Sequence, residues 1–507
     1  MVISILSLCQ CVNGYTRMSL FPYVGFMVKH LLTLSTDEVG YYAGFIASAF
    51  TLGHLLTGYP WGYATDVIGR KPVVVIGLLS IAMFSVAFGF SPTFEWAVGS
   101  SRLMLGLLNA IVPAIRAMAR EVCGPEHVIQ GTAYFGGATG LGIALGSLIG
   151  GLMSQPADHY PSVFSPTGVF ARFPYLFPNL FGASLALLLL PFVIFYVPET
   201  MGSISHPRSG IDDEDVFDSL NATNDDGSGE HVCPNGENFH EPIPQESAPA
   251  PGGGLLAMPH VKTFLILGFA LQMVMIGFQE VYPLWALSTN GAGGLEWDTV
   301  QIGKVAFITG AFMLIGQLAI FPAMIKEIGI ATWSRTGCLL AVGASALVPH
   351  AKALSWNKAS LFAVSATSST LVKFGESAVM IALTVGTTCV VPVHQRGKLS
   401  GLYSTAENFG RFLGPVSYAI MFAWSISDSA PRWVDHCFVF YQCAAVMLGV
   451  TVLSWNTLTS ENLVTPASEG VEKSYGTLDN ITTNAEQREG VDFVSSPTLN
   501  ELKATMT

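Results

Sequence analysis

The sequence predicts an all-α integral membrane protein with twelve transmembrane helices arranged in two six-helix halves. Only 11% of its 507 residues are charged and 50% are apolar, whereas soluble proteins carry about 25% charged residues. The apolar residues gather in long runs, and a membrane helix needs about 20 such residues. The runs are continuous rather than alternating, which favours helices over a barrel because lipid leaves an unpaired backbone group without a partner.

The apolar runs form two sets of six. The first set spans residues 2–28, 39–61, 72–91, 95–118, 128–153 and 174–197. The second set spans residues 259–287, 299–325, 331–350, 359–391, 397–424 and 434–457. We therefore expect one half over residues 1–197 and the other over residues 259–457.

The formal net charge of −12 comes from the two polar segments outside these halves. Residues 198–258 and 458–507 hold 20 acidic and four basic residues, and the remainder holds 15 acidic and 19 basic residues. Their Asp, Glu, Gly, Ser and Pro content predicts a disordered cytosolic linker and tail. The apolar, mildly basic remainder argues against a soluble enzyme or a nucleic-acid binder.

The distribution of basic residues between the loops predicts the orientation. With a cytosolic N-terminus, ten Lys and Arg residues lie in inside loops and six in outside loops, which favours both termini in the cytosol. No sorting motif indicates which membrane holds the protein.

A charged loop motif follows the second predicted span. Its members fit G-x-x-x-D-x-x-G-[RK]-[RK] and are Gly62, Asp66, Gly69, Arg70 and Lys71. The glycines permit a tight turn, and Asp66 can accept hydrogen bonds at a helix N-terminus. At this place in a chain of six plus six spans, the motif resembles the signature loop of the major facilitator superfamily. The resemblance implies that the loop latches one conformation by pairing with neighbouring helix ends.

Other segments extend the resemblance. Arg102 and Gly106 match the R-x-x-x-G pattern of the fourth span, and Pro198-Glu199-Thr200 closes the first half. A helix-packing motif, G-x-x-x-G-P-x-x-G-G, is matched by Gly142, Gly146, Gly150 and Gly151. Its glycines allow close helix approach, and Ser147 stands where the antiporter motif has proline, which weakens the inference of antiport.

A narrower resemblance is to the zinc-induced facilitator-like transporters and, through them, to the twelve-span drug:proton antiporters. It rests on the segments 61–71, 116–122, 155–161, 172–175 and 280–286. It implies that the protein transports a small solute and uses no cofactor. It does not identify the solute.

Ionisable residues inside spans need a partner, a wet cavity or a function. Arg102, Asn109 and Arg116 are spaced seven apart, so we expect them to share one helix face that points into the bundle. Arg17 lies near the middle of the first span, and Glu280 is the candidate for the group that binds the transported proton.

Two further pairs lie three and four residues apart on predicted helices. Lys373 and Glu376, like Glu407 and Arg411, either line the pathway or neutralise each other. Together with Arg17, Arg102 and Glu280, these two pairs give the interior of the bundle a net formal charge that is close to zero or slightly positive. That balance favours an organic anion or zwitterion as the solute.

The spans offer no grouped metal ligands, because His54, Cys9 and Cys11 are scattered. We therefore expect no metal site. The chain also has no nucleophile–base constellation typical of an enzyme.

The resulting hypothesis is a monomeric secondary active transporter in the lipid bilayer, with a solute site between the halves and alternating access. Its partners are a small-molecule solute and protons, and the expected mode is proton-coupled antiport. A uniporter, a cation symporter and a non-transporting membrane sensor remain alternatives.

Overall fold

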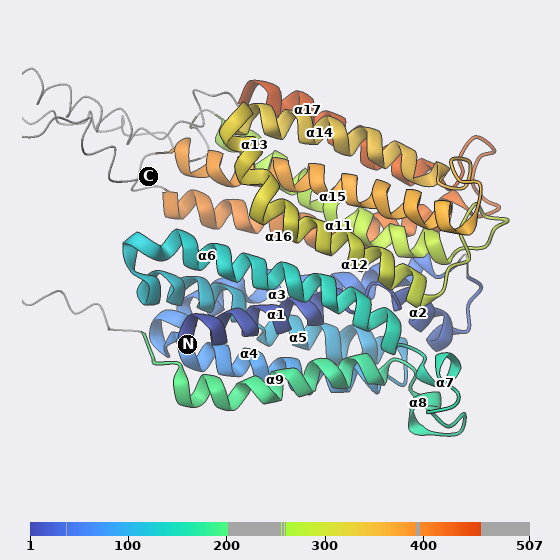
Figure 1. The fold of residues 1–507 in the computed structure, drawn as a ribbon, viewed down its shortest axis with the longest axis horizontal. Helices are drawn as coiled ribbons and strands as arrows, with labels where there is room; N and C mark the ends of the chain where they lie inside the picture. Colours follow the sequence, from blue (N-terminus) through green and yellow to red (C-terminus); the bar gives the residue numbers. More distant parts are fainter. Residues whose placement is uncertain (37, 201–254, 256–257, 259, 392–395, 458–507) are drawn as a thin grey trace, which may run out of the picture.

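The computed structural model describes residues 1–36, 38–200, 255, 258, 260–391 and 396–457, and this part of the chain contains helices and no strand. Most of the predicted linker and the whole predicted tail lie outside the described residues. The prediction of an all-α membrane protein is confirmed. Figure 1 shows the helices of residues 2–196 packed together beside those of residues 261–457.

The elements of the first group are α1 (Val2–Met18), α2 (Val24–Leu32), α3 (Gly40–Val67), α4 (Arg70–Gly89), the π-helical η1 (Trp96–Leu103), α5 (Met104–Leu108), α6 (Ile111–Met153), α7 (Pro156–His159), α8 (Val169–Arg172) and α9 (Leu176–Tyr196). Those of the second group are α11 (Val261–Leu287), α12 (Thr299–Ile315), the π-helical η3 (Gly316–Ile320), α13 (Phe321–Ile328), α14 (Ile330–Leu347), η4 (Val348–His350), α15 (Lys358–Cys389), α16 (Arg396–Ser425) and α17 (Phe438–Thr457).

Two of the predicted spans are interrupted. The span predicted over residues 2–28 is divided into α1 and α2 by a turn at residues 19–23 that contains Pro22, whose missing N–H cannot join a helix ladder. The span predicted over residues 95–118 passes from η1 through α5 to α6, with an extended backbone at Asn109. The Asn109 side chain accepts a hydrogen bond from the Ile111 N–H at 3.3 Å, which takes over the role of a helix carbonyl there.

Element α6 reverses direction along its length. Asn109, just before it, donates to Asn13, and Thr139, within it, lies against Gly14. A straight helix would separate these two points of contact with α1 by about 45 Å, although Asn13 and Gly14 are consecutive. The element therefore comprises two span-length stretches, Trp96–Ala119 (with η1 and α5) and Tyr134–Met153, as the predicted fourth and fifth spans require.

Eight stretches of the described chain are long and apolar enough to cross a membrane. They are Arg70–Gly89, Trp96–Ala119, Tyr134–Met153, Leu176–Tyr196, Val261–Leu287, Thr299–Ile328, Lys358–Thr387 and Phe438–Trp455. The other four predicted spans correspond to α1 with α2, α3, α14 and α16. The count of twelve is consistent with these helices and stays a prediction.

Candidate transport site

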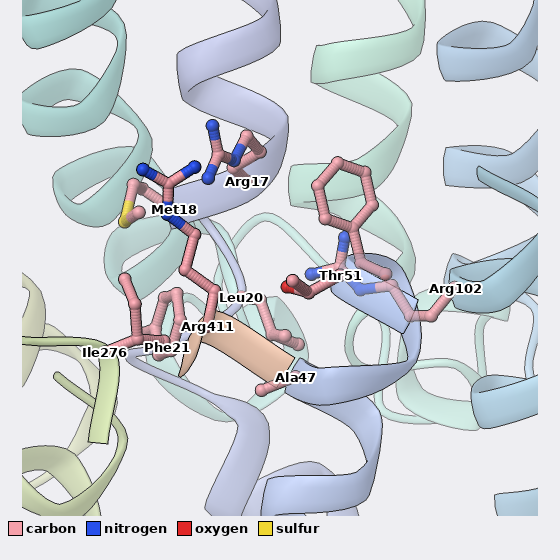
Figure 2. Close-up of a pocket in the computed structure, with 10 residues that line it drawn as sticks. Arg17, Met18, Leu20, Phe21, Ala47, Thr51, Arg102, Ile276 and Arg411 are labelled. Carbon is pink, nitrogen blue, oxygen red and sulfur yellow. The ribbon is translucent and has the colours of Figure 1, made fainter. Parts of the chain in front are cut away.

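A pocket lies where α1, α3, η1, α11 and α16 meet (Figure 2). It encloses about 430 Å³ of empty space, part of it continuous with open solvent. Its lining residues are Arg17, Met18, Leu20, Phe21, Ala47, Phe50, Thr51, Arg102, Ile276 and Arg411. The pocket thus draws on helices from both groups, as a site between two halves requires.

Three guanidinium groups reach this pocket from three elements. Figure 2 shows Arg17 from α1 and Arg411 from α16 with their guanidinium ends near each other, and Arg102 on the other side of Thr51. The sequence analysis placed all three arginines inside the bundle, but it could not predict that α1 and α16 bring two of them together. Such a cluster favours anions that carry a carboxylate or phosphate.

Arg17 has no counter-ion among the residues that the structure describes. Its guanidinium carbon lies 5.8 Å from the centre of the Phe50 ring, and no described carboxylate oxygen comes within the 4.0 Å of an ion pair. A ring face balances only part of a cationic charge. Arg17 is therefore the pocket group with the most unmet capacity to bind an anion.

Arg411 is held by a polar network on α16 and α11. Its Nε donates to Gln272 at 3.0 Å, its Nη1 donates to Asn408 at 3.3 Å, and its Nη2 lies 3.7 Å from Glu407. Gln272 also donates to Glu407 at 3.2 Å. The predicted pairing of Glu407 with Arg411 is therefore present, and the network fixes the direction in which Arg411 enters the pocket.

Arg102 is buried with only partial compensation. It is 4% exposed, its Nη1 donates to the Thr16 carbonyl at 3.4 Å, and it lies 4.7 Å from the centre of the Phe88 ring. Its Nε has no hydrogen-bond partner in the described part of the chain. Its interactions hold the charge in place without neutralising it.

Glu280, on α11, is the most isolated acid of the interior. Its side chain is completely buried, and neither carboxyl oxygen has a hydrogen-bond partner among the described residues. Arg102 is the basic group that acts on it electrostatically, although the two form no ion pair within 4.0 Å. A buried carboxyl without partners is unfavourable when charged.

Lys373 and Glu376 form a buried ion pair on α15. The Lys373 Nζ lies 2.9 Å from the Glu376 Oε2 and also donates to the Met275 carbonyl at 2.6 Å. The second Glu376 oxygen has no partner in the described structure. This geometry favours the reading in which the two charges neutralise each other, and neither residue lines the pocket.

The expected common face of Arg102, Asn109 and Arg116 is wrong in one respect. The spacing argument assumed an unbroken helix, but a π-helical turn and the extended Asn109 interrupt it. Arg102 and Asn109 still face α1, where Asn109 donates to Asn13 at 2.9 Å, and both asparagines are buried. Arg116, beyond the break, is exposed.

Comparison with known proteins decides the family. Residues 6–415 match the Major Facilitator Superfamily. The chain belongs to the major facilitator superfamily. Its members are transporters, so this chain is a membrane transporter by family.

Particular relatives of this major facilitator chain are known from plants. It is 31% identical over 410 residues to a probable peptide/nitrate transporter of Arabidopsis thaliana, covering 80% of each chain. It is 30% identical over 413 residues to ZINC INDUCED FACILITATOR 1 of the same plant, covering 80% of this chain and 81% of the relative. The resemblance to zinc-induced facilitators is thereby confirmed.

A solved structure supports the fold. The crystal structure of a D-xylose–proton symporter superposes with a TM-score of 0.65 at 13% identity, covering 92% of this chain and 99% of the symporter. At this identity the likeness shows the fold alone.

The signature loop of this major facilitator chain binds an acid that the sequence analysis did not assign to it. The backbone N–H groups of Arg70 and Lys71 donate to Glu199 at 2.9 Å and 3.1 Å, at the N-terminus of α4, where a carboxylate is favoured. Gly69 has a φ of 99°, which admits this turn. The Asp66 side chain lies outside the described structure, and Gly62 has open space around it. The sequence feature that could have pointed to Glu199 is the Pro198-Glu199-Thr200 segment at the end of the first half.

The glycine motif packs α6 against two neighbours. Two of its glycines lie against the backbone of α1, Gly142 at Cys11 and Gly146 at Tyr15, and Gly150 lies against Ser19, directly after α1. The fourth, Gly151, lies against Thr299 and Gly303 of α12. A side chain at any of these glycine positions would collide with the neighbouring backbone. The motif therefore sets how closely α1, which carries Arg17, approaches α6.

Proposed function

We propose that this chain is a proton-coupled secondary active transporter of a small organic anion or zwitterion, and that the solute binds in the arginine pocket. The observation that carries the proposal is the convergence of Arg17, Arg102 and Arg411 from both groups of helices. Arg17 lacks a counter-ion in the described structure, so a carboxylate or phosphate of the solute would supply it. The name of one relative, a probable peptide/nitrate transporter, agrees with an anionic or zwitterionic solute.

Glu280 is the proposed proton carrier. Inside a membrane, a carboxylate without hydrogen-bond partners is disfavoured relative to its neutral form. Its nearness to Arg102 gives a route by which a bound anion alters its protonation, because an anion that neutralises Arg102 weakens the attraction that keeps Glu280 charged. An anion on Arg102 would thereby favour protonation of Glu280, which by itself couples solute and proton in the same direction. Antiport requires instead that the two compete for one group, as the ammonium group of a zwitterion and a proton would compete for the Glu280 carboxylate.

The mechanism that follows is alternating access by rocking of the two groups of helices around the pocket. Arg17, Arg102 and Thr51 belong to one group, and Arg411 and Ile276 belong to the other. An anion that bridges Arg17 and Arg411 would draw the groups together. The carboxylate contact of Glu199 with α4 is the proposed latch partner within the first group.

The test is solute flux in proteoliposomes containing the purified chain. A panel of radiolabelled organic anions, zwitterions and cations is screened with an acidic lumen and with no pH gradient. We expect uptake of an anion or zwitterion that the acidic lumen accelerates, and loss of that acceleration in Glu280→Gln. Glu38→Gln, at an exposed loop position, serves as the matched control.

Other outcomes select the alternatives. Flux that does not depend on the gradient indicates a uniporter, and co-transport with a cation indicates a symporter. Unchanged coupling in Glu280→Gln refutes the role of Glu280. The absence of flux for every solute, with the protein folded, favours a membrane sensor.

The pocket is tested separately by Arg17→Gln and Arg411→Gln. A hydrogen bond to a charged group contributes about 1.5–3 kcal/mol, so each substitution should raise the KM of the anion about 10- to 150-fold. Arg17→Lys should restore part of the affinity because it keeps the charge. Lys29→Gln, which removes an exposed charge outside the pocket, should leave the KM unchanged.

A further inference from the structure

Three consecutive residues between α16 and α17 bring unlike metal-ligand atoms together. Asp435, His436 and Cys437 each offer one ligand atom, and these atoms all lie within 4.8 Å of one another. Asp435 is exposed, His436 is half-buried and Cys437 is buried. The scattered ligands of the predicted spans gave no reason to expect a metal site, whereas this group depends on how a loop folds.

The spacing of the two softer donors fits zinc. The Cys437 Sγ lies 3.5 Å from the His436 Nε2. In a tetrahedral zinc site, Zn–S is about 2.3 Å and Zn–N about 2.1 Å, which places the two ligand atoms about 3.6 Å apart. The described side chains therefore stand at nearly the separation that a bound ion would require.

The surroundings of His436 orient its ring. The ring packs on Gly293, whose φ of 84° belongs to the left-handed region. A side chain at position 293 would collide with the ring, so the glycine leaves the space in which the imidazole lies beside Cys437.

Contacts at the same end of the bundle join η4 and the loop after it to α17, which directly follows these residues, and to the loop between α11 and α12. His350, in η4, bonds through its Nε2 to the Tyr441 hydroxyl at 2.7 Å. Lys352 donates to Asn290 of the loop between α11 and α12. Asp435 accepts from the Cys437 N–H at 2.9 Å. The ligand atoms are thus presented by a loop with fixed backbone contacts.

We propose that Asp435, His436 and Cys437 form a Zn²⁺ site with three protein ligands and a fourth position for water or a further ligand. A mixed thiolate, imidazole and carboxylate set suits Zn²⁺ and disfavours Mg²⁺ and Ca²⁺, which prefer oxygen ligands alone. The loop lies at the end of the bundle away from the start of α1 (Figure 1). The site is separate from the arginine pocket and would fasten the start of α17, independently of the solute carried.

The test uses the full-length protein, purified, stripped with a chelator and dialysed against ZnCl₂ or CoCl₂. We expect one equivalent of zinc per chain by elemental analysis, a higher unfolding temperature with zinc, and a cobalt–thiolate absorption band. His436→Ala and Cys437→Ala should each lower the zinc affinity at least about tenfold and abolish the band. His30→Ala, an exposed histidine, and Cys338→Ala, a buried thiol, should keep all three signals.

Two results would overturn the proposal. One is a wild-type protein that retains no more zinc than Cys437→Ala. The other is a cobalt complex without the thiolate band. Should an alanine variant fail to fold, Asp435→Asn and His436→Gln provide the comparison, and unchanged zinc affinity in both would equally refute the site.

Discussion

The close contact between Gly146 of α6 and the backbone of α1 predicts that a larger residue at position 146 will displace Arg17 in the pocket. In Gly146→Ala, the new Cβ would lie 2.7 Å from the Tyr15 carbonyl oxygen and 2.9 Å from its Cα. Both atoms belong to the backbone, so no side-chain rotation relieves the clash. Either α1 or α6 must retreat by about 0.7 Å to reach ordinary contact.

The size of the effect follows from two opposing terms. Overpacking costs about 1–3 kcal/mol, and replacing a helical glycine by alanine returns about 0.5–1 kcal/mol. The net loss should therefore be at most about 2.5 kcal/mol, with a midpoint of about 1 kcal/mol, a fall of a few degrees in unfolding temperature. Because Arg17 follows Tyr15 by two residues, the shift should also move its guanidinium and raise the KM of the solute several-fold.

The assay compares two alanine variants of the same element. Gly136→Ala is the control because the space around Gly136 is open. Unfolding temperature in detergent and solute KM in proteoliposomes are measured for both variants. If Gly146→Ala behaves like Gly136→Ala in both measurements, the close approach of α6 to α1 does not hold Arg17 in place, and the reasoning is refuted.

The remaining predictions concern contacts outside the pocket and are read as unfolding temperatures in detergent. Glu199→Ala removes two hydrogen bonds to the start of α4 and should cost about 1 kcal/mol, with Glu199→Gln intermediate. Asn109→Leu leaves Asn13 without its buried partner and should cost about 1–3 kcal/mol, and the added change Asn13→Leu should recover part of it. Lys373→Met leaves the buried Glu376 without its ion-pair partner and should lower the free energy of unfolding by about 3–5 kcal/mol. The double variant with Glu376→Leu should lose much less stability.

Each of these has an outcome that contradicts it. Equal unfolding temperatures for wild type and Glu199→Ala would mean that water satisfies the N-terminus of α4 as well as the carboxylate does. Strictly additive losses in either double variant would show that its two partners do not interact. For Lys373, a loss of only a few tenths of a kcal/mol would mean that Glu376 is already neutral.

Local patterns in the sequence predicted the long helices well, because an apolar run long enough to cross lipid has few alternatives. The spans predicted over residues 331–350 and 359–391 correspond to α14 and α15 despite their polar residues. Breaks inside spans were missed at Pro22 and Asn109. Asn109 carried a signal, since an asparagine can satisfy its own neighbouring backbone, but the sevenfold spacing to Arg102 favoured an unbroken helix.

Contacts between distant segments could not be predicted from spacing. Arg17 and Arg411 are separated by most of the chain, so only the fold, in which α1 and α16 both border one pocket, reveals that they share it. The role of Glu199 likewise depends on α9 ending beside α4. The three ligand atoms at Asp435, His436 and Cys437 come together through a loop conformation, and the periodicity of the sequence predicts helices and strands but not loop conformations.

The helices outside the eight long apolar stretches are informative about the site. Three of the four predicted spans concerned correspond to α1 with α2, which are each too short, and to α3 and α16, and these carry Arg17, Thr51 and Arg411 of the pocket. A helix tolerates polar residues inside a membrane only where other helices cover them or where they line a cavity. A broken or more polar span among strongly apolar spans is therefore a candidate for a helix that lines the pathway, and its polarity can be read from the sequence before any contact is known. Helix α14 is an exception, because it lies outside the eight stretches without lining this pocket; its Arg335 reaches α17, where it donates to the Trp455 carbonyl at 2.9 Å.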